Sequence, residues 1–94
     1  MSGQRRMFRY VVPVDDNPWT FDLTSGPVHV ANGASLGEVE FWAEFTDGAP
    51  KQARHFVVVG TGHPLPQDGR YVGTCPRTPE GIVWHLYEIA PPAS

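Results

Sequence analysis

The chain has 94 residues, of which 40% are hydrophobic and 18% are charged, with ten glycines and ten prolines. This length fits a single small domain, and the composition favours a folded core interrupted by many turns. The net charge of −3 provides no general basic field, which argues against a nucleic-acid polymer as partner. No apolar segment is long enough for a signal peptide or a membrane span, so we expect no membrane association.

Cys75 is the only cysteine, so the chain cannot form an intrachain disulfide. A single free thiol fits a reducing compartment, and we expect a cytoplasmic protein. Nothing beside Cys75 would lower the pKa of its thiol, and Pro76 follows at once. These neighbours indicate a buried or half-buried thiol rather than a nucleophile.

Alternating apolar residues in the first third of the chain predict short strands joined by turns. The first strand spans 7–14 and lies at a sheet edge, because Pro13 cannot donate a hydrogen bond to a neighbouring strand. Strands at 19–23 and 28–31 follow, each after a turn rich in Asp, Asn, Ser, Gly or Pro. His29 faces away from the valines of the third strand and is expected to be exposed.

The clearest alternation lies in the segment 38–45. Its core set comprises Val39, Phe41, Ala43 and Phe45. Its outer set comprises Glu38, Glu40, Trp42 and Glu44, so we expect a solvated acidic surface around one tryptophan. Trp42 then needs a partner, which is either a hydrophobic layer from another part of the chain or a subunit or ligand surface.

The segment 55–61 contains three consecutive valines, which indicate burial on both faces and are typical of a central strand. The chain then breaks into Gly60-Thr61-Gly62-His63-Pro64 and returns as a strand at 71–75. This order predicts a hairpin with the glycine-rich loop at its tip. A last strand spans 82–89.

Seven short strands without helical periodicity predict an all-β fold, a single small antiparallel sandwich or barrel. The domain is expected to cover 7–89. Residues 1–6 and 90–94 are expected to be flexible ends.

The loop after the central strand is the candidate binding site. Its two glycines could let backbone amides converge on an anion, with hydroxyl groups and an arginine nearby. Trp42 or Tyr87 could stack on a base. The predicted ligand-binding set comprises Gly60, Thr61, Gly62, His63, Arg70, Thr74, Trp42 and Tyr87. The alternative is that the glycines and prolines only bend the chain at a stiff tip.

Four motifs resemble a family of small β-rich proteins of unknown function found in actinobacteria and phages: Phe41-Trp42-Ala43-Glu44, Gly60-Thr61-Gly62-His63-Pro64, Val72-Gly73-Thr74 and Trp84-His85-Leu86-Tyr87-Glu88. The likeness spans Phe8 to Glu88. It implies a β-rich fold and supplies no active-site residue. If the chain is phage-encoded, the resemblance implies that it acts in the host cytoplasm.

Our leading hypothesis is a non-enzymatic, homo-oligomeric protein that binds a small anion such as a nucleotide. In a phage setting it would act as a sponge that sequesters a nucleotide or cyclic nucleotide signal, an anti-defence role. The alternative is a protein–protein interaction module, a phage accessory or virion component that uses the exposed aromatic β face around Trp42.

A third hypothesis is a hydrolase that uses His63 or His85, although the sequence lacks a complete nucleophile, base and oxyanion set. The four histidines, at positions 29, 55, 63 and 85, show no recognised ligand spacing. We therefore expect no metal site and no cofactor.

Overall fold

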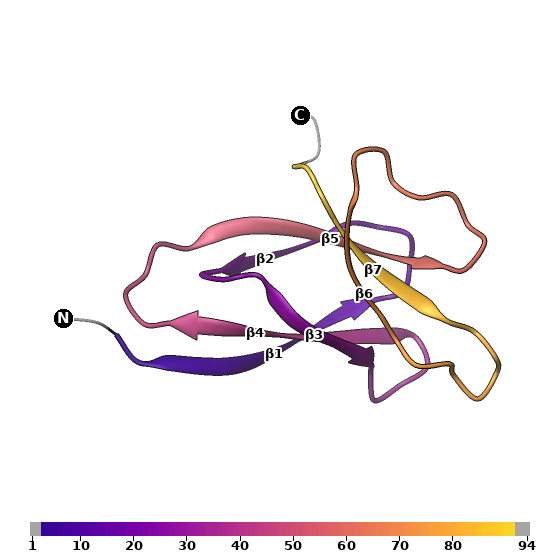
Figure 1. The fold of residues 1–94 in the computed structure, drawn as a ribbon, viewed down its shortest axis with the longest axis horizontal. Helices are drawn as coiled ribbons and strands as arrows, with labels where there is room; N and C mark the ends of the chain where they lie inside the picture. Colours follow the sequence, from indigo (N-terminus) through magenta and orange to yellow (C-terminus); the bar gives the residue numbers. More distant parts are fainter. Residues whose placement is uncertain (1–2, 92–94) are drawn as a thin grey trace.

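The computed structural model describes residues 3–91, which form seven β-strands and no helix. Hence no described segment is a helix long and apolar enough to cross a membrane. The strands, labelled in Figure 1, are β1 (Arg5–Pro13), β2 (Trp19–Leu23), β3 (Pro27–Asn32), β4 (Glu38–Thr46), β5 (Gln52–Gly60), β6 (Arg70–Thr74) and β7 (Trp84–Ile89).

The strands form two antiparallel sheets, one in the order β1-β4-β3 and the other in the order β2-β5-β7-β6. The predicted all-β antiparallel fold is therefore confirmed, as an open two-sheet arrangement rather than a closed barrel within the described chain. β1 lies at a sheet edge and β5 lies between two neighbours, as the proline and the valine run predicted.

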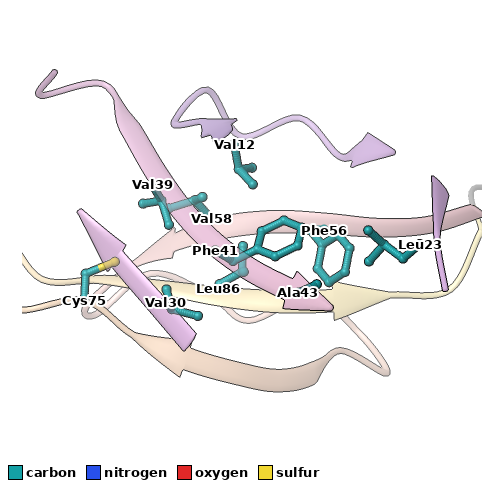
Figure 2. Packing of buried hydrophobic residues seen from close by; sticks show 10 residues of the cluster. All are labelled: Val12, Leu23, Val30, Val39, Phe41, Ala43, Phe56, Val58, Cys75 and Leu86. Atoms are coloured by element: carbon teal, nitrogen blue, oxygen red, sulfur yellow. The ribbon is translucent and has the colours of Figure 1, made fainter. Parts of the chain in front are cut away.

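The core lies between the two sheets, where the inward positions of both meet. Phe41 of β4 and Phe56 of β5 are completely buried, and their ring centroids lie 5.0 Å apart. Figure 2 shows these rings among the ten buried side chains, to which β2, β3 and β7 also contribute. Of the predicted core set on β4, Phe45 is only half-buried, and its ring stacks on that of the exposed Phe8.

The predicted hairpin between the fifth and sixth strands is wrong. Gly60, the last residue of β5, is paired with Trp84 at one end of β7, whereas Arg70, the first residue of β6, is paired with Glu88 at the other end. β5 and β6 are therefore parallel to each other, with β7 between them. Residues 61–69, here called the crossover loop, must traverse β7 to join them (Figure 1).

The crossover loop lies against the outer face of its sheet. A Cβ atom on Gly69 would lie 3.3 Å from the Tyr87 ring, and Val59 on the outer face of β5 is only 7% exposed. Pro64 and Pro66 lie in the middle of the loop and favour an extended backbone there. The loop spans a strand instead of reversing as a tight turn of about two to five residues.

Several strand ends differ from the prediction. β1 begins at Arg5, within the segment 1–6 that was expected to be flexible, because the arginines of this end pair with acids on and beside β4. β5 also begins earlier, at Gln52, and β7 begins later, at Trp84. The rest of the predicted flexible ends falls partly outside the described residues, at 1–2 and 92–94.

Candidate functional site

A chain of hydroxyl groups surrounds His85 on β7. The Nδ1 atom of His85 lies 3.0 Å from Thr74 Oγ1 on β6, and its Nε2 atom lies 2.8 Å from Thr61 Oγ1 in the crossover loop. The Tyr71 hydroxyl extends the chain, 2.6 Å from Thr74 Oγ1. Two residues of the predicted site, Thr61 and Thr74, are thus brought together on either side of one imidazole.

The direction of this hydrogen-bond chain follows from its last member. The Thr61 hydroxyl lies 3.3 Å from the carbonyl oxygen of Val83, which can only accept. The single proton of the Thr61 hydroxyl can go to this carbonyl or to His85 Nε2, and donation to Val83 makes the hydroxyl an acceptor for His85 Nε2–H. In the neutral ring Nδ1 then accepts from Thr74, which in turn accepts from Tyr71.

A surface hollow of about 420 Å³ opens beside the His85 chain, at the start of β7. Its lining includes Gly60, Thr61, His63, Arg77, Ile82 and Trp84. The volume falls in the range of about 300–1,000 Å³ that is usual for small-molecule sites. Ile82 is 43% exposed, so the hollow has an apolar wall that solvent reaches.

Arg77 and His63 supply the polar side of the hollow. Within residues 3–91, Arg77 and Arg70 form no salt bridge, whereas the other four arginines each pair with a carboxylate. The hydrogen bonds of histidine rings in the same stretch belong to His55 and His85. The hollow therefore presents a cation and an imidazole that the fold itself does not use.

The glycines of the loop serve packing and backbone geometry. A Cβ on Gly60 would lie 3.1 Å from the Trp84 ring, so glycine lets the indole pack on the backbone. Gly62 has φ +90°, which favours glycine. The amides of Thr61 and His63 already donate to the carbonyls of Val83 and Gly60. Because these two amides are partnered, they do not form the expected anion nest.

Arg70 lies at the opposite end of β7 from the hollow. Its strand partner is Glu88, four residues or roughly 13 Å along β7 from Trp84. Glu88 accepts two hydrogen bonds of 2.7 Å from Arg54, and this contact holds the pKa of Glu88 below its ordinary value. Arg70 therefore places its positive charge near the Arg54–Glu88 ion pair and not near the glycine-rich loop.

Tyr87 and Trp42 also lie apart from the hollow. Tyr87 contacts Tyr71 edge-on, with ring centroids 5.7 Å apart, beside the crossover loop. Trp42 belongs to the other sheet, where the His29 ring covers it at 5.5 Å. Its partner is thus a neighbouring strand of the same sheet. His29 is exposed, as predicted.

The acidic surface predicted around Trp42 is partly wrong. Glu40 is only 7% exposed, and its carboxylate lies 3.2 Å from Arg9 of β1. Glu44 is likewise joined to Arg5 at 3.2 Å. Sequence alternation alone could not show this, because it does not reveal which strand supplies the neighbouring cations.

The structure also places the groups considered for metal binding and catalysis. Within residues 3–91, no three or more His, Cys, Asp or Glu side chains gather as potential metal ligands. Cys75 is buried as predicted, at 3% exposure, and burial raises the pKa of its thiol to about 11. Both ring nitrogens of His85 are already engaged by hydroxyl groups.

Five residues of the hollow were missed from the sequence: Arg77, Gly81, Ile82, Val83 and Trp84. Arg77 lies in a Pro-rich turn that reads as an ordinary connection between two strands. One signal was available, since an isoleucine and a tryptophan follow that turn closely and flank the start of the last strand. Without the order of the strands, the sequence could not show that this turn lies next to the glycine-rich loop.

A family described as a domain of unknown function, DUF7352, matches residues 3–94. The chain therefore belongs to this family. Comparisons with curated proteins and with solved structures find no match.

Proposed function

We propose that this member of the DUF7352 family is a non-enzymatic binding protein whose ligand is a small organic anion of the nucleotide class. One observation carries the proposal: the hollow at the start of β7 combines the unpaired Arg77 and His63 with the apolar wall of Ile82 and Trp84. Gly60 and Thr61 of the predicted site line the same hollow.

The chemistry of the lining matches the two halves of a nucleotide. A guanidinium makes short, charge-assisted hydrogen bonds to phosphate oxygens, frequently two in parallel. An aromatic or apolar wall can take the flat face of a base, a contact worth about 1–3 kcal/mol per base. Arg77 would bind the phosphate, while Trp84 and Ile82 would contact the base.

The resemblance to actinobacterial and phage proteins supports a more specific setting. In a phage, a small cytoplasmic chain that binds a nucleotide or cyclic nucleotide would lower the free concentration of that signal in its host. Such a sponge needs only affinity and abundance. The environment of His85 supports this non-enzymatic role, because hydroxyl groups of the fold already engage both of its ring nitrogens.

Isothermal titration calorimetry of the full chain against nucleoside monophosphates, diphosphates and cyclic mononucleotides and dinucleotides tests the proposal. We expect at least one to bind and Arg77→Ala to weaken that binding at least tenfold. Arg70→Ala is the matched control, because it removes the same charge at the other end of β7. Absence of binding across the panel would refute the proposal.

A second pair of variants tests the position of the ligand. Ile82→Ala shortens the exposed apolar wall and should weaken binding several-fold, whereas Leu65→Ala removes an exposed side chain outside the hollow and should not. If Arg70→Ala and Leu65→Ala are the damaging changes instead, the ligand binds elsewhere on the sheet and this site assignment is wrong.

A further inference from the structure

The four sheet edges of this protein differ in how well they are protected from pairing with another strand. β3 and β6 are interrupted by register shifts, between Pro27 and His29 and between Tyr71 and Gly73. β2 has only five residues. β1 is paired with β4 over nine residues without a shift. Bulges and short strands prevent edge pairing, so β1 is the one open edge of the described chain.

The backbone groups that β1 leaves free can be assigned from its register. Val14 N–H donates to Gly37 O, and Asp47 N–H donates to Gln4 O. In an antiparallel pair the hydrogen-bonded positions alternate, so the even-numbered residues of β1 bond to β4. The amides and carbonyls of the odd-numbered residues therefore point to the free edge. Pro13 has an odd number, and its missing N–H falls on that free edge.

The first half of β1 is also accessible. All five residues from Arg5 to Arg9 are exposed, including Met7 at 52% and Phe8 at 41%. This exposure places two apolar side chains next to unpaired backbone groups, on opposite faces of the strand.

The three arginines of β1 do not make this edge a binding surface for an acidic partner. Arg5, Arg6 and Arg9 lie 3.1–3.2 Å from carboxylates of this same chain, those of Glu44, Asp47 and Glu40. These ion pairs leave the edge close to neutral overall, so two copies can approach, and only arginines placed directly opposite each other would repel.

We propose that β1 pairs antiparallel with β1 of a second copy of this chain. The two-fold axis passes through Phe8, so that Phe8 faces Phe8 of the other copy and Met7 faces its Arg9. The two β1-β4-β3 sheets then join into one continuous sheet, and the open edge disappears at the interface.

Electrostatics selects this register among its neighbours. The free groups belong to odd-numbered residues, so only registers that place odd opposite odd form hydrogen bonds. An axis through Met7 places Arg5 opposite Arg9, and an axis through Arg9 places Arg9 opposite itself. Like charges directly opposite destabilise a sheet. The axis through Phe8 avoids both pairs and brings two aromatic rings together instead.

Sedimentation of the full chain across roughly 10 µM to 1 mM tests the pairing, because a small interface dissociates in that range. We expect the mass to rise from 10.4 kDa toward twice that value. Met7→Pro removes an amide that points to the free edge without breaking the β1–β4 ladder, and it should abolish the dimer. Met7→Ala keeps the amide, so this variant should still form the dimer.

Disulfide trapping tests the register without a proline. Directly facing Cα atoms of a non-hydrogen-bonded pair lie about 4.5 Å apart, which is within disulfide range. Oxidised Phe8→Cys should therefore form a covalent dimer, and Met7→Cys, displaced by two residues from its copy, should not. A monomer at every concentration, a dimer that survives Met7→Pro, or trapping by Met7→Cys alone would each overturn the proposal. Nucleotide binding at the hollow is a separate measurement and does not affect these outcomes.

Discussion

The two ends of β7 use charge in opposite ways. At the Glu88 end, Arg54 is held by a two-pronged contact of 2.7 Å, and the two side chains are only 23% and 15% exposed. At the Trp84 end, Arg77 forms no salt bridge within residues 3–91 and lines the hollow. The same residue type is therefore a structural group at one end and a free group at the other.

This difference separates an arginine that the fold uses from one that the proposed ligand could use. A half-buried ion pair holds its partners in place, and breaking it costs stability because the remaining charge is poorly solvated. An exposed, unpaired arginine contributes little to folding, so its removal should affect binding rather than stability. Variants at the two ends should separate these roles.

The largest effect is expected from Glu88→Ala. The substitution leaves the Arg54 guanidinium half-buried without its acceptor, and we expect the free energy of unfolding to fall by about 2 kcal/mol, below the value for fully buried pairs. Urea denaturation followed by circular dichroism measures the change. Arg77→Ala, measured in parallel, should remain within about 0.5 kcal/mol of the parent chain. Equal losses from both variants would contradict the distinction between the two ends.

A smaller effect is expected from Gly62→Ala in the crossover loop. Gly62 has φ +90°, and nothing lies within 4 Å of a Cβ built there, so the cost arises from backbone strain alone. We expect a loss of about 1 kcal/mol. Gly37→Ala is the matched control, since that position is equally open and has no positive φ. It should be neutral or slightly stabilising.

The pH dependence of stability should include a contribution from the Glu88 end of β7. Arg54 holds the folded-state pKa of Glu88 below its ordinary value of 4.5. The stabilisation from this pair is therefore complete above about pH 4.5 and is lost as the pH falls through the folded-state pKa. Thermal melts between pH 6 and 3 should show a steeper decline for the parent chain than for Glu88→Gln. Parallel curves would mean that the ion pair does not couple folding to pH.

Sequence patterns predicted the elements of this fold better than their arrangement. The alternation at 19–23 predicted both ends of β2 correctly. Pro13 correctly predicted that β1 lies at a sheet edge, and the run of valines correctly predicted that β5 lies inside a sheet. Pairing between distant strands depends on side chains that meet across the core, which no local pattern records. The crossover loop shows this limit clearly, because its turn residues and its prolines are compatible with a hairpin and with a crossing.

The candidate site was predicted only in part, because its residues come together through the strand order, which the sequence did not reveal. Thr61 and Thr74 were chosen as flanks of an expected hairpin, and the structure brings them together because the start of the crossover loop and the end of β6 both lie beside His85 of β7. Arg70 was chosen by the same reasoning, and it lies at the far end because β6 runs parallel to β5. The hollow itself depends on a second connection, the turn that carries Arg77, whose position only the strand order determines.

The smallest predicted effect concerns the proton on His85, and it tests the Trp84 end at the level of single atoms. We expect the Thr61 hydroxyl to donate to the Val83 carbonyl and to accept from His85 Nε2–H. The Nε2–H tautomer should therefore dominate the ring's ¹⁵N shifts near neutral pH. Thr74→Val leaves this anchor intact and should preserve the preference, with a stability change within about 0.5 kcal/mol because water replaces the exposed hydroxyl. Thr61→Val removes the anchor and should weaken the preference, since Thr74 can donate or accept. Dominance of the Nδ1–H form in the parent chain would reverse the assigned direction.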